Sequence, residues 1–175
     1  AVLIEFVPST LGPLTANTNI SVDIVASDLG GDVVSAFDIL VEYDETILNN
    51  HTIFHSSEFG AYDADPWLTE YDHWFSFGTG ETNFGVFSWL WNDELALIQD
   101  GASVLLFTMS FNVLADADST ALSFVWDEIH DVKCGDPEGF DAVVCSPTAV
   151  PEPGTLALLA LGLLGMAATR RRQKI

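Results

Sequence analysis

Positive charge is almost absent from the first 150 residues of this 175-residue chain, which hold 25 acidic residues and one cation, Lys133. The resulting formal charge of −24 repels phosphate backbones, so it excludes nucleic acid as a main partner. The other four cations lie in the last six residues, and residues 151–175 carry a formal charge of +3. So large a charge difference between two parts of one chain predicts that they lie in different surroundings.

Sequence signatures of common enzymes are also missing. The chain contains no GxSxG elbow, no Walker loop, no glycine-rich nucleotide turn and no HExxH helix. His51 and His55 are four residues apart in HTIFH, the spacing of two metal ligands on a helix. The segment follows an expected strand and turn, however, so we expect these histidines at the surface or at a sheet edge.

Pairs of acids are the remaining catalytic candidates. Asp63/Asp65 and Asp93/Glu94 would suit a polysaccharide hydrolase if two carboxyl groups faced one groove at a suitable separation. A segment with 25 acids in 150 residues contains such pairs by chance, and solvated carboxylates explain them equally well. A hydrolase is therefore the least favoured function, and we expect no enzyme.

Cysteine is scarce, and the two that occur frame the segment CGDPEGFDAVVC, from Cys134 to Cys145. Asp136, Pro137 and Gly139 supply turn-forming residues between them. In an oxidising compartment we expect a disulfide, which would contribute about 3 kcal/mol on the loop-entropy model. The alternative is a pair of reduced, buried thiols. No CxxC or Cys/His spacing suggests zinc.

Amphipathic helices of ten or more residues are lacking before residue 151, and alternation of apolar and polar residues dominates instead. Ile20, Val22 and Ile24 alternate with polar residues, and Phe37, Ile39, Val41 and Tyr43 share one face of a second strand. In 104–113, Leu105, Phe107, Met109, Phe111 and Val113 are expected to point one way. Further candidate strands are 2–7, 85–91, 121–126 and 140–145. Residues 1–148 are thus predicted to form one antiparallel β-sandwich domain.

Aromatic residues are concentrated between Tyr62 and Trp91, which hold ten of the 20 in the chain. Phe87, Trp89 and Trp91 alternate, so we expect them on the core face of one strand. The other rings are interleaved with turn residues and acids, which favours partial exposure. The candidate surface for a sugar, a protein or lipid headgroups consists of Tyr62, Trp67, Tyr71 and Trp74.

Calcium is the one cofactor that the sequence raises. Asp116 and Asp118 lie with Ser119 in the tight loop ADADST, and their hard oxygens suit calcium. Asp63 and Asp65 offer a similar pair. The spacing lacks the glycine and the distal glutamate of an EF-hand loop, and polar turns that cap strands are the simpler interpretation. We expect no other cofactor.

The chain ends in an apolar run followed by basic residues. Residues 154–169 carry no charge and are rich in Leu and Ala, and as a helix they would span about 24 Å. A basic cluster directly after such a run indicates a cytoplasmic C-terminus. We therefore predict a transmembrane helix over 155–169, a basic cytoplasmic tail over 170–175, and a bulk domain outside. A helix packed on the globular domain is the alternative.

The order of features in this tail resembles the PEP-CTERM sorting signal of Gram-negative envelope proteins. Its parts are Pro151-Glu152-Pro153, a short apolar helix and Arg170-Arg171-Arg172. The resemblance implies export, anchoring at the inner membrane and processing by an exosortase near the linker 149–154. The prolines favour an extended, accessible linker. The chain shows no N-terminal signal peptide, as expected if one has been removed or the sequence has been trimmed.

The strand pattern carries a second resemblance, to cohesin domains. In 17–48 the matching positions are Phe37, Ile39, Tyr43, Asp44 and Leu48, and 104–125 resembles the family's paired C-terminal strands. This implies a jelly-roll sandwich of about nine strands, related to carbohydrate-binding modules. Glu45 stands where the family usually has proline, and 55–84 look unlike it, so dockerin recognition does not carry over residue by residue.

Two functions remain in view besides the hydrolase. The first is a membrane-anchored, non-catalytic module, periplasmic or extracellular, that binds an envelope protein or a glycan. The second is an accessory subunit of an integral membrane complex, docked through its helix and its aromatic surface. Small residues at 157, 160, 162 and 165 would permit close helix packing in lipid.

Overall fold

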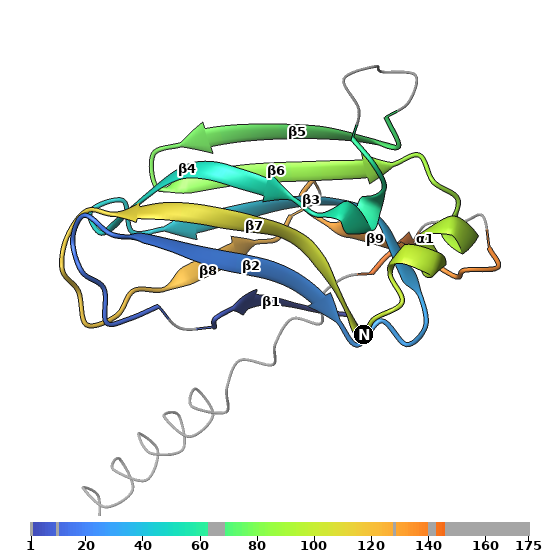
Figure 1. Cartoon of the computed structure of the whole chain (residues 1–175), viewed down its shortest axis with the longest axis horizontal. Helices are drawn as coiled ribbons and strands as arrows, with labels where there is room; N and C mark the ends of the chain where they lie inside the picture. The colour runs from blue at the N-terminus through green and yellow to red at the C-terminus, as the bar shows by residue number, and fades with distance from the viewer. Residues whose placement is uncertain (1, 10, 63–68, 128, 140–142, 146–175) are drawn as a thin grey trace, which may run out of the picture.

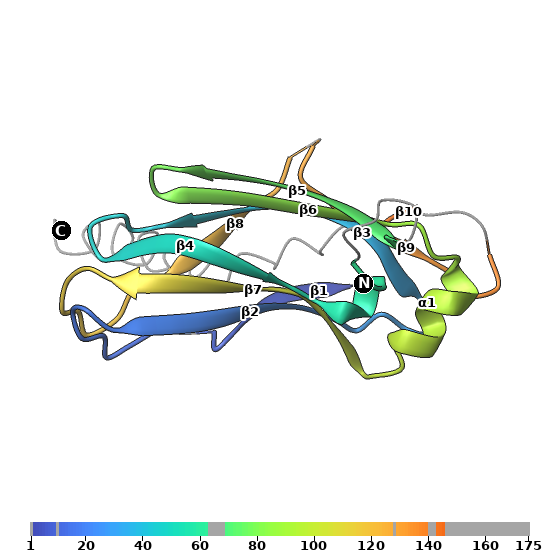
Figure 2. The ribbon, with the colours of Figure 1, turned by 45° about the horizontal axis from the view of Figure 1, so that its top comes forward.

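The computed structural model describes residues 2–9, 11–62, 69–127, 129–139 and 143–145. Two antiparallel sheets stack face to face in this part of the chain, as Figures 1 and 2 show from two sides. The described residues form ten strands, against about nine expected. The predicted all-β antiparallel sandwich is thus confirmed.

The smaller sheet has four strands in the order β1-β2-β7-β4. Their bounds are Leu3–Val7 for β1, Asn19–Ser27 for β2, Ser103–Val113 for β7 and Leu48–His55 for β4. The long central pair, β2 and β7, aligns Val22 with Met109 and Ile20 with Phe111. All four of these side chains face the opposite sheet, as the alternation in the sequence predicts.

The larger sheet has the order β10-β9-β3-β6-β5, and β8 pairs with β3 beyond the end of β9. The bounds are Val143–Val144 for β10, Val132–Gly135 for β9, Val33–Tyr43 for β3, Glu81–Ser88 for β6, Tyr71–Gly78 for β5 and Leu122–Val125 for β8. β5 and β4 are the edge strands on one side of the sandwich. Their inner faces meet only partly, which leaves aromatic side chains of β5 uncovered.

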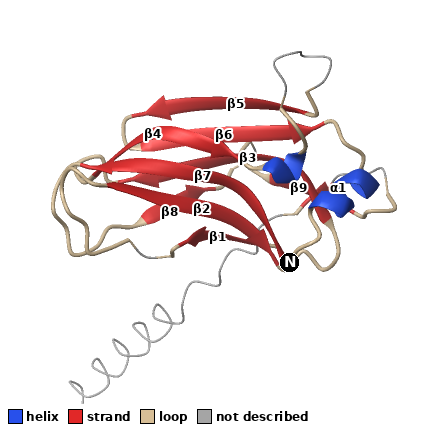
Figure 3. Cartoon of the chain, viewed as in Figure 1, coloured by secondary structure: helices blue, strands red, loops and turns tan. Residues whose placement is uncertain are grey.

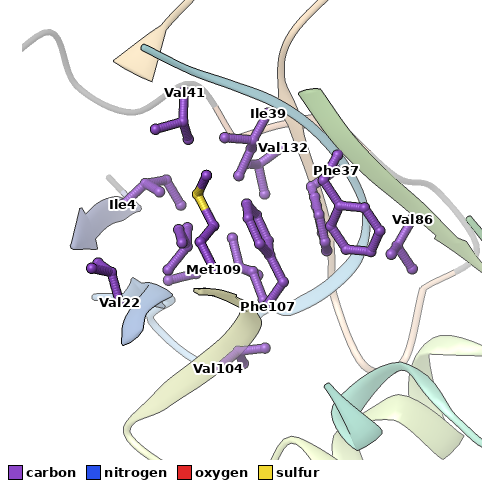
Figure 4. Close-up of a cluster of buried hydrophobic side chains, with 14 of the residues drawn as sticks. Ile4, Val22, Phe37, Ile39, Val41, Val86, Val104, Phe107, Met109 and Val132 are labelled. Carbon is purple, nitrogen blue, oxygen red and sulfur yellow. The ribbon is translucent and has the colours of Figure 1, made fainter. Parts of the chain in front are cut away.

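The core lies between the sheets and is built mainly from the strands whose alternation is cleanest. Figure 4 shows side chains of β2, β3, β7 and β9 pointing toward one another there. Phe37 stacks against Phe107 and meets Phe84 and Phe59 at an angle. The labelled members of this cluster are Ile4, Val22, Phe37, Ile39, Val41, Val86, Val104, Phe107, Met109 and Val132, all buried.

One inward position in β7 was predicted wrongly. Ile24 pairs with Phe107 and Val25 with Leu105, so Leu106 is an extra residue on β7, a β-bulge. The bulge reverses the alternation, and Val104 and Leu106 are fully buried whereas Leu105 is only half-buried. The predicted inward residues from Phe107 to Val113 are buried as expected.

Two short helices close one end of the sandwich (Figure 3). They are the 3₁₀-helix η1, Ser57–Phe59, and α1, Asn92–Ile98, which contacts both η1 and β3. Gln99, just after α1, is buried; its amide donates to the carbonyls of Val34 and Glu58 and accepts from the Val34 N–H, each at 2.8 Å. This side chain ties the helical end to the central strand of the larger sheet.

The segments predicted as linker 149–154, transmembrane helix 155–169 and basic tail 170–175 lie outside the described residues. Within the described ranges no helix is both long and apolar enough to cross a bilayer.

Candidate binding surface

The outer face of the larger sheet carries a group of exposed aromatic side chains. Trp74 comes from β5, Phe87 from β6, and Trp89 and Trp91 from the segment between β6 and α1. They are 43–62% exposed. We call these four residues the aromatic face. The inward positions of β6 are instead Thr82, Phe84, Val86 and Ser88, all buried.

This corrects the prediction that Phe87, Trp89 and Trp91 belong to the core. Phe87 lies on the outward face of β6 with Glu81 and Asn83, and Trp89 and Trp91 lie beyond the end of the strand, so the alternation of these three rings does not mark a core face. Ser88 lies inward because its hydroxyl donates to the carbonyl of Phe59 at 2.8 Å. The rings that the sequence assigns to the core therefore extend the exposed aromatic region.

Trp74 is fixed in place by three neighbours. It lies opposite Gly85 in the β5–β6 register, and a Cβ at position 85 would overlap indole atoms Cε2 and Cζ2. Its Nε1 donates to Oδ2 of Asp38 at 3.0 Å, and Nδ2 of Asn83 donates to Oδ1 of the same carboxylate at 2.8 Å. The glycine thus allows the indole to cover the strand while the carboxylate holds its edge.

Two adjacent hollows lie beside these rings. The first, of about 440 Å³, is lined by residues of β3, β5, β6, β9 and the segment before β9, among them Asp38, Trp74, Phe87, Ile129, Asp131 and Lys133. The second, of about 400 Å³, is lined by Ser35, Phe87, Ser88, Trp89, Leu90, Trp91, Asn92 and Gly139. They share Ser35 and Phe87, so together they form a track over the sheet. Phe87 and Trp89 meet edge to face, 4.9 Å between ring centres.

Negative charge surrounds the aromatic face. Asp72 pairs in register with Phe87, and Glu42 lies directly opposite Glu81, a like-charged cross-strand pair. Lys133, the sole Lys or Arg before residue 170, forms an ion pair with Asp131. At the far end of β3, hydrogen bonds from the hydroxyl and backbone N–H of Thr46 lower the pKa of Asp44, which keeps it charged.

A second aromatic cluster lies at the open edge between β4 and β5. The His55 and His73 rings meet edge to face at 4.3 Å, and the Tyr71 hydroxyl lies 3.1 Å from Nδ1 of His55. Burial, with a smaller contribution from His73, lowers the pKa of His55. Burial also raises the pKa of Tyr71, so its hydroxyl stays protonated.

The four aromatic residues predicted as one surface separate in the structure. Trp74 belongs to the aromatic face, and Tyr62 is exposed at the open edge, 5.2 Å from the His73 ring. Tyr71 is 3% exposed and is no part of a surface, because β5 turns it inward opposite Ser88. Trp67 lies outside the described residues. The structure therefore does not bring the described three of these residues together on one exposed surface.

The predicted calcium loop has polar contacts within the fold. Oδ1 of Asp116 accepts a hydrogen bond from the backbone N–H of Ala16 at 2.7 Å, which ties the β7–β8 loop to the β1–β2 loop. Asp118 is exposed in the same loop. No group of three or more potential metal ligands occurs among the described residues. Asp63 and Asp65 lie outside them.

Other predicted residues serve the fold. Cys134 and Cys145 form the predicted disulfide, which joins buried β9 to the end of β10. The acid pair 93/94 lies at the start of α1, where the Glu94 carboxylate accepts from the Trp91 N–H at 2.9 Å. HTIFH lies in β4, an edge strand, and His55 lies at the edge as expected.

Sequence reasoning missed Asp38 and Gly85 as parts of the surface. From the sequence alone, Asp38 falls simply on the polar face of its strand, opposite the face of Phe37 and Ile39. A usable signal existed at Gly85, because a glycine inside a strand often marks the close approach of another group. It lies between Phe84 and Phe87 in an aromatic-rich segment.

Comparison with known proteins supports both resemblances. A family model of the PEP-CTERM protein-sorting motif matches residues 149–172, which include Pro151–Pro153 and Arg170–Arg172. Comparison with curated proteins finds no match.

Solved cohesin structures share the fold of the sandwich. A type II cohesin of Bacteroides cellulosolvens matches with a TM-score of 0.58 and 11% identity, over 85% of this chain and 92% of that one. A type II cohesin from the cellulosome of Acetivibrio cellulolyticus matches with a TM-score of 0.56 and 12% identity, over 81% of this chain and 87% of that one. A chain of a type I cohesin–dockerin complex of Clostridium thermocellum matches with a TM-score of 0.52 and 11% identity, over 83% of this chain and 92% of that one. At these identities the likeness concerns the fold alone.

Proposed function

Because the chain joins a sandwich of the cohesin fold to a PEP-CTERM sorting motif, we propose that it is a non-catalytic extracytoplasmic binding module. In this proposal the motif directs the protein to an exosortase at the inner membrane. The segment 155–169 anchors it there, with residues 170–175 on the cytoplasmic side and the sandwich outside. The motif match and the fold support export and binding.

The aromatic face is the observation that carries the proposal. Trp89 and Trp91 are about 60% exposed and line the second hollow, which shares Phe87 with the first. Exposed rings of this size, grouped on one face, are typical of protein–protein contacts, where aromatic residues dominate the buried centre. We assign this face to a protein partner of the cell envelope. A dockerin-like protein is one candidate, since a neighbour in the fold comparison is a cohesin in complex with a dockerin.

A binding role also agrees with the structural roles of two acidic side chains, Glu58 and Glu94. Glu58, whose pKa is raised by burial, accepts a hydrogen bond from the Leu105 N–H at 3.0 Å and holds η1 to β7. Glu94 caps α1. Both carboxylates are therefore explained by the fold without a reaction.

Capture of envelope proteins tests the proposal. The full chain, kept in mild detergent because of its apolar run, is immobilised and mixed with solubilised envelope proteins, and bound proteins are identified by mass spectrometry. Trp89→Ala is expected to reduce capture of the partner at least tenfold, as a central aromatic contact would.

Phe54→Ala is the matched control, since Phe54 is 55% exposed on β4 of the other sheet. It should capture the partner as the natural chain does. If both variants lost partner capture equally, or if neither variant lost it, the aromatic face would be excluded as the binding site. Capture of polysaccharide in place of protein would favour a glycan-binding module.

A further inference from the structure

The first hollow of the aromatic face has aromatic walls and a carboxylate. Trp74 of β5 and Phe87 of β6 line it together with Asp38 of β3, which lies opposite Gly85 in the β3–β6 register. A carboxylate has about four acceptor sites. Trp74 and Asn83 use one on each oxygen of Asp38, so each oxygen retains an acceptor site for a further donor. Both present donors are neutral, and they leave the negative charge of Asp38 unbalanced.

The charges around the hollow favour a cation. Lys133 lines it, but its amino group is paired with Asp131, and the Lys133 side chain is 37% exposed. Asp72 adds another acid on the same face, next to Phe87 in the β5–β6 pairing. Asp38, Asp72 and Asp131 outnumber the one cation. An entering anion would be repelled, and an entering cation would relieve repulsion among the acids.

The shape of the site distinguishes between cations. A guanidinium is planar, stacks on aromatic rings and donates two parallel hydrogen bonds to one carboxylate, whereas an ammonium is a compact, strongly hydrated point charge. The indole of Trp74 covers Gly85 with its edge held by Asp38, so ring and carboxylate are already placed side by side.

We infer that this hollow is the receptor for an arginine side chain of the protein partner. The inference rests on the proposed function, since it names the chemistry of the partner at the same face. The guanidinium stacks on Trp74 or Phe87 and donates to both oxygens of Asp38. The partner therefore presents an arginine on a surface that is basic overall, which complements the −24 charge of residues 1–150.

Titration of the full chain with a small arginine probe tests the inference. The probe is N-acetyl-arginine methylamide, and its neutral isostere is the citrulline derivative. In nuclear magnetic resonance spectra, the Nε1–H signal of Trp74 reports directly on the group that donates to Asp38. We expect the arginine probe to move this signal saturably, and the citrulline and lysine derivatives to bind at least several-fold more weakly.

Asp38→Asn is the decisive variant, because the amide oxygen still accepts from Trp74 while the charge is removed. It should weaken binding of the arginine probe about tenfold or more, as loss of a charge-assisted hydrogen bond does. Glu5→Gln is the matched control. Glu5 is an exposed acid on β1 of the other sheet whose carboxylate accepts from the Ser27 hydroxyl at 3.1 Å. That variant should bind the probe like the natural chain.

The inference and the proposed function fail in different ways. If the probe causes no saturable shift, or if citrulline binds as well as arginine, or if Asp38→Asn has no effect, the guanidinium site is overturned. Loss of partner capture in Trp89→Ala would still support the proposed function in each of those cases. If the probe binds as expected but Asp38→Asn captures the partner undiminished, the partner does not use the site, and the inference is again overturned.

Discussion

At the scale of single residues, Gly85 determines where Trp74 lies. No side chain other than hydrogen fits beneath the indole, since a Cβ there would overlap two of its ring atoms. The glycine is in the middle of β6, where it weakens a strand unless close approach of another group requires it. The aromatic face thus depends on a residue that itself contributes no surface.

Gly85→Ala is expected to displace Trp74 from Asp38. Overpacking of this kind costs about 1–3 kcal/mol unless the side chain swings out to solvent, in which case stability changes little and the indole hydrogen bond is lost. The signal of the Trp74 Nε1–H reports which occurs, and denaturant unfolding gives the free energy. An unchanged indole signal together with unchanged stability would contradict the packing described.

His55 supplies a pH-dependent contribution to stability. Its pKa is lowered in the folded state by burial and by His73, whereas in the unfolded chain it titrates near the ordinary value of about 6.5. As the pH falls, the unfolded state takes up the proton first. The stability due to neutral His55 is therefore fully present above the unfolded pKa and is lost as the pH falls from there through the folded pKa.

We expect the free energy of unfolding to fall more between pH 8 and pH 6 in the natural chain than in His55→Gln. The carboxylates common to both proteins cancel in this difference. Denaturant unfolding at several pH values measures it, and a titration of the His55 ring signals should give a pKa below about 6.5. A steeper pH dependence in the variant would contradict the assignment.

At the scale of secondary structure, the sequence predicts strands well where one face is buried and the other solvated. β2, β3 and most of β7 alternate in this way, and their inward residues were named correctly. β5 was missed because it is an edge strand with aromatic side chains on both faces, Trp74 outward and Phe75 and Phe77 inward but uncovered. β9 has only four residues, and in β7 the bulge at Leu106 is invisible to a pattern of period two.

The helical end of the sandwich also went unpredicted, since α1 has only seven residues and the polar side chain of Gln99 ties its C-terminal end to the sheet. Gln99→Ala removes three hydrogen bonds and leaves the N–H and C=O of Val34 buried without these partners. We expect a loss of about 2–4 kcal/mol in the free energy of unfolding, because unpaired buried groups cost more than exposed ones.

Leu97→Ala on the same helix is the control for this measurement. Leu97 is 80% exposed, so its truncation should change stability by less than about 0.5 kcal/mol. Both values come from denaturant unfolding of the purified proteins. If Gln99→Ala were as stable as Leu97→Ala, the hydrogen bonds of Gln99 with Val34 and Glu58 would not contribute as described.

At the scale of the whole molecule, the charge asymmetry and the sorting motif bear on the location of the protein in the cell, whereas the fold and the aromatic face bear on what it binds. The fold class was predictable because alternation is a local property, and the sorting motif because its residues are adjacent in sequence. The aromatic face was predictable only as a region, since Asp38, Trp74 and Gly85 meet through the pairing of β3, β6 and β5. A pattern of neighbouring residues in the sequence cannot predict which strands pair, so it could not show that these three residues meet.

The tail makes a testable contribution to topology. In the proposed topology, four cations near an anionic leaflet would contribute about 1 kcal/mol each, and the acidic domain could not replace them. Replacing Arg170, Arg171, Arg172 and Lys174 with Gln should release part of the protein outward or scramble its anchoring, while the sandwich still folds. Protease added to intact spheroplasts should digest residues 1–150 of the natural chain. Protection of this domain would show the opposite orientation.

The central claim is that the aromatic face binds a protein partner in the cell envelope, and photo-crosslinking in living cells tests it most directly. A photoreactive amino acid replaces Trp89 in one strain and Phe54 in another; both side chains are more than half exposed, on opposite sheets. Irradiation is expected to link the chain with the replacement at 89 to one discrete partner protein, and the chain with the replacement at 54 to none. A discrete adduct at 54 and none at 89, or the same adduct at both, would contradict the account.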